Sequence, residues 1–226
     1  QAYNNKAFAL QKLNKIEDSL NNYYKAFKID PNSDFLLGEL IHTKNKICDW
    51  GNFDQDLKIL KEKIIEKKKT STPFPTLHLY DSPILQKICA ETWNKDKFQN
   101  KNNNFIHTFP KTSKKIRIGY YSSDFYNHAM SYLLAGLFEH HNKSKFEIIA
   151  FSFSPEKNDE MSKRISKSFD QFININLKTD KEVAELSKKL KIDIAVDLLC
   201  FTSNNRMGIF SEKCAPIQIN YLGYPG

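Results

Sequence analysis

The side chains most suited to chemistry lie in the segment SSDFYNH, which ends at His128. This segment places a carboxylate, an amide and an imidazole close together, on Asp124, Asn127 and His128. Histidine titrates near neutral pH, so it can accept the proton of a hydroxyl group in an acyl or glycosyl transfer. The alternative is structural, because Ser123 or Asp124 could cap a following helix and His128 could lie at the surface or in a cap. The segment is therefore a candidate acid–base site with a plain structural alternative.

Two further segments contain the residue types of a binding loop. The segment CAPIQINYLGYPG runs from an apolar stretch into glycines and prolines. Gly223 and Gly226 would let backbone amides approach a ligand closely, and Pro225 would stiffen the loop. In FTSNNRMGIF, Arg206 could bind a phosphate or pair with an acidic side chain, and the second role is the commoner one. Taken alone, each segment is also consistent with an ordinary junction between a strand and a loop.

The elements that must position these residues alternate, from Lys115 onward, between apolar β-type runs and amphipathic helical segments. This alternation is typical of right-handed βαβ units and of a Rossmann-like parallel sheet covered on both faces. The carboxyl ends of such strands gather at one edge, and SSDFYNH begins where the first strand ends. The sequence has neither a GxGxxG nor a Walker A pattern. We predict strands over 116–122, 146–153, 172–177, 193–199 and 217–223, with helices over 131–141, 158–168 and 180–190.

The first 31 residues have the pattern of a tetratricopeptide unit, which is a pair of packed helices. Small residues let the two helices approach closely, aromatic residues fill the space beside them, and a proline ends the second helix. Because one unit cannot bury its own apolar face, we expect further repeats before Gln1. The matching positions are Tyr3, Ala7, Leu10, Ser19, Tyr23, Ala26 and Pro31.

Residues 32–114 are predicted to form helices and a connector. Two helices broken at Gly51 are expected to close the array, the second with an apolar stripe at positions 53, 57, 60 and 64. A connector is expected over 71–114, in which Pro73, Pro75 and Pro83 break regular structure before a helix near 83–98.

Composition narrows the class of protein. Hydrophobic residues make up 40% of the chain and no run approaches the ~18 apolar residues of a membrane span, so we predict a globular protein without one. The four cysteines have no metal-ligand spacing, which predicts no metal site and favours a reducing cytoplasm. The formal charge of +8 lies mostly on lysines of the N-terminal half. We interpret KKK at 67–69 as a solvated helix face, with nucleic-acid binding as the less favoured alternative.

Three segments in order resemble the catalytic region of the O-GlcNAc transferase family, including its bacterial tetratricopeptide members. They are KIRIGYYSSDFYNHAMSYLLAGLFEHHNKSKFEIIAFSF, DIAVDLLCFTSNNRMGIF and APIQINYLGYPG. The resemblance implies an α plus α/β fold in which the end of a tetratricopeptide array precedes the N-terminal Rossmann-like lobe of a GT-B glycosyltransferase core. It assigns residues 1–70 to the array and its closing helices, 71–114 to a connector and 115–226 to the catalytic lobe.

The resemblance also implies an activity, namely transfer of N-acetylglucosamine from UDP-GlcNAc to Ser or Thr hydroxyls of proteins. His128 corresponds to the family's active-site histidine, proposed as the base that acts on the acceptor hydroxyl. Leu222, Gly223 and Pro225 match a loop that lines the sugar and acceptor site. The expected partners are the UDP-sugar donor and a polypeptide acceptor held by the repeats, without a metal or other cofactor. Gln171 stands where animal members carry a second active-site histidine, which puts that role in doubt.

Two alternatives remain open at this point. The family's second lobe supplies most contacts to the nucleotide, and the sequence stops at Gly226 before such a lobe, so we expect this piece alone to be inactive. The chain could instead belong to a non-catalytic tetratricopeptide scaffold that binds proteins. It could also use the same fold with another nucleotide sugar, such as one that carries fucose or glucose.

Overall fold

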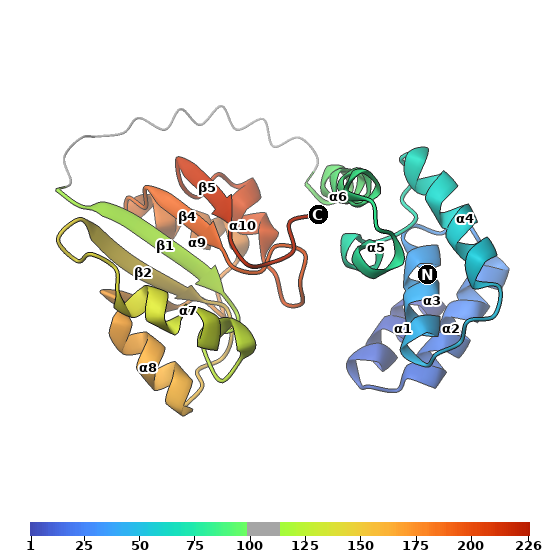
Figure 1. The fold of residues 1–226 in the computed structure, drawn as a ribbon, viewed down its shortest axis with the longest axis horizontal. Helices are drawn as coiled ribbons and strands as arrows, with labels where there is room; N and C mark the ends of the chain where they lie inside the picture. Colours follow the sequence, from blue (N-terminus) through green and yellow to red (C-terminus); the bar gives the residue numbers. More distant parts are fainter. Residues whose placement is uncertain (99–113) are drawn as a thin grey trace. The chain divides into compact units, whose positions relative to one another are not determined.

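A computed structural model describes residues 1–98 and 114–226 (Figure 1). The described residues form two compact units, a helical unit before residue 99 and a sheet unit after residue 113. Among these residues, no helix combines the length and the apolar character needed to cross a membrane.

The helical unit begins with two antiparallel helices joined by a tight turn, as the tetratricopeptide pattern predicts. Ser19 donates a hydrogen bond of 2.8 Å from its Oγ to the carbonyl oxygen of Ala7, and both residues are fully buried. This contact places the helices close together because neither side chain is bulky. Tyr23 is buried beside it, whereas Tyr3 is 41% exposed although the pattern expects a packed aromatic. The helices of this unit are α1 (Ala2–Lys12), α2 (Ile16–Ile29), α3 (Leu36–Lys46), α4 (Phe53–Ile65), α5 (Pro73–Leu79) and α6 (Pro83–Lys97).

Prolines start two of these helices. Pro73 and Pro83 are the first residues of α5 and α6, where the missing N–H has no intrahelical partner to lose. The expectation that Pro73 and Pro75 break regular structure is therefore wrong, because proline at a helix start favours the helix. Gly51 does separate α3 from α4 as predicted. Helices α5 and α6 contribute Leu79, Leu85 and Cys89 to the same hydrophobic core as Ile41 of α3 and Leu60 of α4.

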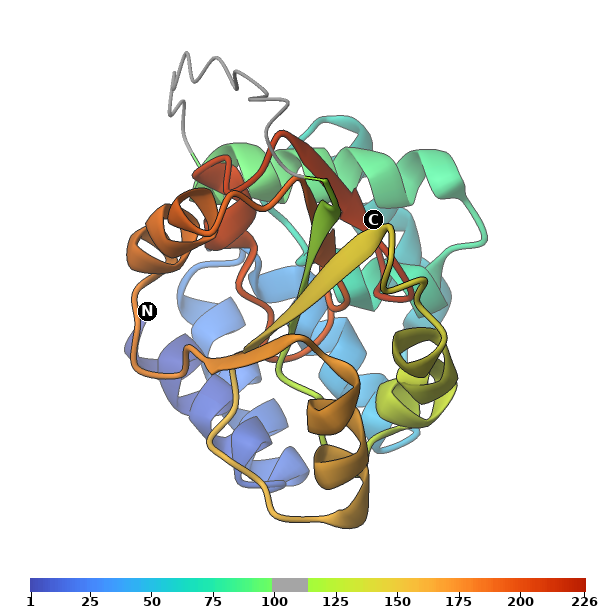
Figure 2. The same ribbon diagram turned by 90° about the vertical axis from the view of Figure 1, so that its left-hand side faces the viewer.

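The sheet unit contains five parallel strands in the order β3-β2-β1-β4-β5 (Figures 1 and 2). Helices cover both faces, which confirms the predicted parallel sheet. Helices α7 and α8 pack on one face through residues such as Phe138 and Ile165, and α9 and α10 pack on the other through Val183 and Ile209. The elements are β1 (Ile116–Ser122), α7 (Ala129–Glu139), β2 (Phe146–Ser152), α8 (Glu160–Ser168), β3 (Gln171–Asn174), α9 (Asp180–Lys189), β4 (Ile194–Asp197), α10 (Met207–Ser211) and β5 (Ile217–Asn220).

Side chains bonded to nearby amides make some strands shorter than predicted. The Oδ1 atom of Asp197 accepts hydrogen bonds from the amides of Leu199 and Cys200, at 2.9 and 3.1 Å. This turn ends β4 at Asp197, whereas the apolar run predicts a strand up to Leu199. Asn174 accepts a bond from the amide of Asn176 and ends β3 in the same way.

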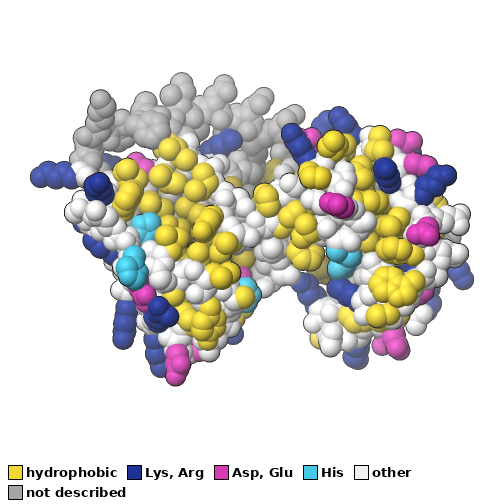
Figure 3. All heavy atoms as spheres, viewed as in Figure 1, with side chains coloured by type: hydrophobic (Ala, Val, Ile, Leu, Met, Phe, Trp, Pro, Cys, Tyr) yellow, Lys and Arg dark blue, Asp and Glu magenta, His cyan; other side chains and the backbone are white. Residues whose placement is uncertain are grey.

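Strand β5 forms one edge of the sheet. Its Ile217 and Ile219 point away from the core and are 46% and 47% exposed, and Tyr221 just beyond the strand is equally exposed. Figure 3 shows that hydrophobic side chains also reach the surface elsewhere on the sheet unit, on the face that is drawn. The edge strand therefore carries apolar side chains on its outer face.

Candidate functional site

The loops that leave the carboxyl ends of the strands meet at one edge of the sheet, because all the strands are parallel. SSDFYNH leaves β1, which is the central strand, and LGYPG leaves β5. Strand β4 lies between these two, so the segments are separated by two strand spacings, roughly 10 Å. The predicted site residues are thus brought to the same edge but onto different loops.

His128 is the residue that immediately precedes α7, and its ring both caps the helix and stays accessible. Its Nδ1 accepts a hydrogen bond of 3.3 Å from the amide of Met130. The same Nδ1 lies 3.7 Å from Oδ2 of Asp124, and the His128 side chain is 43% exposed. The sequence expects Ser123 or Asp124 as the cap, but α7 begins two residues earlier than predicted and the cap is His128 itself. His128 is therefore a helix cap, as the structural alternative expects, with a ring that is still accessible.

Asp124 is held in place by its neighbours. The Oγ of Ser123 donates to its Oδ1 at 2.6 Å, and the Oγ of Ser122 accepts from its backbone amide at 2.9 Å. The residue is buried, yet its second carboxylate oxygen faces the imidazole of His128. A buried carboxylate beside Nδ1 can fix the orientation and the tautomer of a histidine.

Asn127 is positioned through its backbone, by a residue that sequence reasoning missed. Its amide donates to Oδ2 of Asp159 at 3.1 Å, while Oδ1 of Asp159 caps α8 by accepting from the amide of Ser162 at 2.8 Å. These N–H donors, Ser162 first, lower the pKa of Asp159 below its usual value. Asp159 thus ties the loop of His128 to the start of α8. The available signal was an acidic residue at the start of a predicted helix, where such residues commonly cap.

The LGYPG loop is fixed by contact with the loop after β4. A Cβ atom on Gly223 would lie 2.3 Å from the carbonyl oxygen of Leu199, so only glycine fits there. Next to it, the amide of Phe201 donates to the carbonyl oxygen of Tyr224 at 3.0 Å. Leu222 has a left-handed backbone with φ of 68° and is half exposed, and Pro225 is also exposed. Leu222 and Pro225 are therefore the accessible members of the predicted trio.

A pocket of about 430 Å³ lies at this edge, formed by the loops after β1, β2, β3 and β4. Tyr126 lies within it, 5.9 Å from the ring of His128 between centroids, and the amine of Lys157 sits 5.7 Å from the centroid of Tyr126. Sequence reasoning named none of its polar residues except Ser123 and Arg206. The only feature of the sequence that could have identified the other polar residues is that they follow the ends of predicted strands. The lining residues are Ser123, Tyr126, Phe153, Ser154, Pro155, Lys157, Asn176, Asn204 and Arg206.

Arg206 lines this pocket with a guanidinium that is already paired. It donates to Oδ1 of Asp180 at 2.8 Å and to the carbonyl oxygens of Ile175 and Lys178 at 3.0 and 2.6 Å. The guanidinium also lies 5.5 Å from the ring centroid of Phe153. Of the two predicted roles, pairing with an acid is the one that the structure confirms.

Gln171 lies apart from these residues. It is the first residue of β3, at the amino end of the strand, and its Nε2 donates to Oε1 of Glu147 at 3.4 Å. His128 follows the carboxyl end of β1. Gln171, for which the resemblance implied a histidine position of animal members, is therefore directed toward Glu147.

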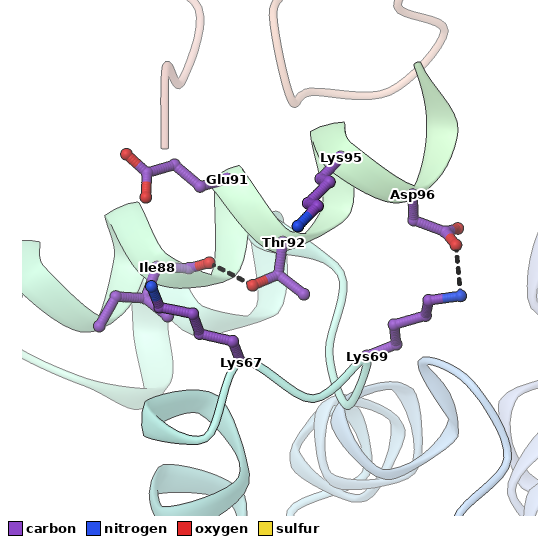
Figure 4. Close-up of a pocket in the computed structure, with 7 residues that line it drawn as sticks. All are labelled: Lys67, Lys69, Ile88, Glu91, Thr92, Lys95 and Asp96. Atoms are coloured by element: carbon purple, nitrogen blue, oxygen red, sulfur yellow. Dashed lines mark hydrogen bonds and ion pairs between the residues drawn. The ribbon is translucent and has the colours of Figure 1, made fainter. Parts of the chain in front are cut away.

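A second pocket, of about 390 Å³, lies in the helical unit between α6 and the segment after α4 (Figure 4). It contains both signs of charge, and its Lys69 forms ion pairs with Asp96 at 2.6 Å and with Asp34 at 3.3 Å. None of the predicted site residues lines it. In the described parts of the chain, no three or more His, Cys, Asp or Glu side chains are grouped so as to hold a metal ion.

Known proteins resemble this chain in sequence. The family model described as Glycosyl transferase family 41 matches residues 47–226. The "Probable UDP-N-acetylglucosamine--peptide N-acetylglucosaminyltransferase SEC" of Arabidopsis thaliana is 35% identical over 50% of this chain and 12% of its own length. The UDP-N-acetylglucosamine--peptide N-acetylglucosaminyltransferase of Caenorhabditis elegans is 26% identical over 79% of this chain and 17% of its own. The chain thus spans less than a fifth of these relatives.

A solved structure has a similar fold. A mutant O-GlcNAc transferase from Thermobaculum terrenum superimposes with a TM-score of 0.57 and 19% sequence identity, covering 99% of this chain and 50% of that one. Because the sequence identity is only 19%, this similarity shows a shared fold alone.

Proposed function

The chain belongs to glycosyl transferase family 41, and from that membership we propose that it is part of an enzyme that glycosylates proteins. The proposed reaction transfers N-acetylglucosamine from UDP-GlcNAc to Ser or Thr hydroxyls, as the names of the plant and nematode relatives indicate for those proteins. The observation that carries the proposal is His128, an accessible imidazole at the carboxyl end of the central strand with a carboxylate beside its Nδ1.

The proposed architecture assigns each unit a part of this task. The sheet unit would be the N-terminal Rossmann-like lobe of a GT-B core, which the strand order β3-β2-β1-β4-β5 and the helices on both faces support. Helices α1 and α2 would be the end of a tetratricopeptide array that recruits a polypeptide acceptor, which the contact between Ser19 and Ala7 supports.

His128 would act as the base in the transfer step. The acceptor hydroxyl oxygen attacks the anomeric carbon, the bond from that carbon to the diphosphate oxygen breaks, and the hydroxyl proton passes to Nε2 of His128. Nε2 accepts a proton only in the tautomer that carries hydrogen on Nδ1. Oδ2 of Asp124 lies 3.7 Å from Nδ1 and would accept that hydrogen after a small rotation of the imidazole, so we assign Asp124 a positioning role.

The LGYPG loop would line the sugar and acceptor site. Leu222 and Pro225 are exposed at the same sheet edge as His128, and Gly223 holds the loop against Leu199. In this proposal protein groups, without a metal or another cofactor, stabilise the leaving diphosphate. A cytoplasmic location is in keeping with four free cysteines, of which Cys89, Cys200 and Cys214 are buried.

The test uses the complete protein with UDP-GlcNAc and a mixture of acceptor peptides. Substitution His128→Ala should lower the rate of sugar transfer more than about tenfold, because a positioned base contributes at least that much. His140→Ala is the matched control, since His140 lies at the other end of α7 and contacts the carbonyl oxygen of Gly136. Circular dichroism checks that both variants fold.

Transfer by His128→Ala at the wild-type rate would refute the assignment. Replacing the donor with UDP-glucose or GDP-fucose in the same assay distinguishes the other nucleotide sugars. A protein that binds peptides but transfers no sugar from any donor would be the scaffold alternative.

A further inference from the structure

Two histidines from different helices meet on the helical unit. His42 belongs to α3 and His78 to α5, and the Nδ1 of the first lies 3.3 Å from the Nε2 of the second. Their ring centroids are 4.8 Å apart and the ring planes are inclined by 56°. Two nitrogens bound at about 2.0–2.1 Å to one tetrahedral zinc ion are separated by about 3.3–3.4 Å. The two ring nitrogens are therefore spaced like two corners of a metal's coordination tetrahedron.

Asn45 provides a third polar group at the same place. It lies three residues after His42, on the same face of α3, and its Nδ2 is 3.5 Å from Nε2 of His78. Its Oδ1 is buried and lacks a hydrogen-bond partner in the described residues. The two ends of an amide are assigned from their surroundings, and a half turn of the side chain would bring the oxygen beside His78. In that orientation the amide oxygen could contact a cation held by the two rings, and Nδ2 would take the position that Oδ1 has now.

We propose that His42, Asn45 and His78 form a binding site for a divalent transition-metal ion, with Zn²⁺ as the expected occupant. Two imidazole nitrogens and one amide oxygen suit Zn²⁺, Cu²⁺ and Ni²⁺ better than the hard cations Mg²⁺ and Ca²⁺. His78 is exposed, so the fourth position of the ion would open to water. The bound ion would join α3 to α5, a role distinct from the chemistry at His128.

An imidazole binds a metal ion in its neutral form, through the ring nitrogen that carries no hydrogen. Lys46 acts electrostatically on both rings. The positive charge of Lys46 opposes a cation, and Lys46→Ala should therefore strengthen binding.

The simpler alternative is a direct hydrogen bond between the two rings, which would hold α5 against α3 without an ion. The two cases differ in measurable ways. A ring-to-ring hydrogen bond gives no response to added Zn²⁺, whereas a metal site gives saturable binding of one ion per chain and a higher melting temperature in its presence.

The experiment titrates Zn²⁺ into the untagged, chelator-treated 226-residue chain at pH 7.5 and follows binding by calorimetry. Wild type should bind one ion. His78→Gln and His42→Gln should each weaken binding at least about tenfold, which is the loss that even an outer-shell partner of a metal site causes. His140→Gln, at a helix end of the sheet unit, should bind like wild type. Asn45→Asp should bind more tightly, because a carboxylate adds a negative charge to the ligand set.

A second measurement separates ligation from a role in folding. Co²⁺ added in place of Zn²⁺ should give the visible absorption of a tetrahedral cobalt site, and His78→Gln should lose this absorption while keeping its circular dichroism spectrum. The proposal is overturned if wild type binds no ion saturably, or if His42→Gln and His78→Gln both bind Zn²⁺ as tightly as wild type.

Discussion

At the scale of single residues, the imidazole of His128 has two competing partners. When Nδ1 accepts the amide hydrogen of Met130, a neutral ring carries its own hydrogen on Nε2 and cannot take a proton there. When Nδ1 carries the hydrogen and turns it toward Asp124, Nε2 is free to act as a base. The helix cap and the proposed base are thus different states of one side chain, and Asp124 favours the second.

This competition predicts the effect of Asp124→Asn in the complete protein. The amide keeps an oxygen for Ser123 but removes the charge that favours hydrogen on Nδ1, so kcat should fall about tenfold or more. Transfer rates across pH 5–9 provide the measurement, because a positioning carboxylate also alters the pH profile. Glu160→Gln removes a nearby exposed charge and should leave the rate unchanged. A wild-type rate and pH profile for Asp124→Asn would exclude this role.

Asp197 predicts a dependence of stability on pH. Burial raises its pKa above the ordinary value of 3.8, although hydrogen bonds from the amides of Leu199 and Cys200 oppose the shift. The stability that it contributes is therefore fully present below pH 3.8 and is lost as pH rises through the raised pKa. Asp197→Asn retains an accepting oxygen but cannot ionise, so at pH 7 it should be more stable than wild type by up to about 1 kcal/mol.

Urea denaturation of wild type and Asp197→Asn at pH 3.5 and pH 7 measures this difference in the free energy of unfolding. The stability gained by Asp197→Asn should be smaller at pH 3.5. Asp197→Ala removes both accepted bonds and should cost about 2–3 kcal/mol at either pH. Equal stability differences for Asp197→Asn at the two pH values would contradict the argument.

Residue positions could be predicted from the sequence where the signal is local, and could not where it depends on distant contacts. The segment around His128 could be placed at a strand end because the apolar run before it is unambiguous. The acid that pairs with Arg206 is Asp180, 26 residues earlier in the chain, and only the folded sheet brings the two together. The pocket beside Tyr126 combines residues from four loops, and their arrangement depends on long-range packing.

At the scale of elements, a backbone contact holds one of the loops at the sheet edge in its position. The loop after β5 lies directly on the backbone of the loop after β4, with Gly223 against the carbonyl group of Leu199. The strands themselves were predictable from their apolar runs. Their ends were not, because Asp197 and Asn174 end β4 and β3 through hydrogen bonds to amides that apolar patterning does not reveal.

This contact predicts the effect of Gly223→Ala. The added methyl group would overlap the carbonyl group of Leu199 and displace the loop, which should destabilise the sheet unit by about 1–3 kcal/mol. Gly136→Ala is the matched control, because a Cβ there meets no atom within 4 Å and alanine favours a helix by up to about 1 kcal/mol.

Urea denaturation of both variants gives the two free energies of unfolding, and sugar transfer by the complete protein shows whether the loop must stay in place. Tolerance of Gly223→Ala with unchanged stability would show that the loop can shift without cost.

At the scale of the whole chain, the described residues supply one side of the proposed reaction. They include the candidate base, a positioning carboxylate and a glycine-anchored loop, all at one sheet edge. The chain spans 12–17% of the plant and nematode relatives, and the inactivity expected of this piece alone stays a prediction. The division at residues 70 and 114 also stays a prediction, although α5 and α6 share a core with α3 and α4.

The outer edge of the sheet has a consequence for the behaviour of this chain in solution. Natural edge strands are commonly blunted by a lysine, a proline or a bulge, which discourages another molecule from adding a strand. Strand β5 reads Ile-Gln-Ile-Asn, without a charge, and carries exposed isoleucines. No other strand of the described residues pairs with its outer side, and its apolar surface makes this edge a place where separate molecules can begin to aggregate. A lysine in place of Ile219 is accordingly the first change to make when preparing this chain at high concentration.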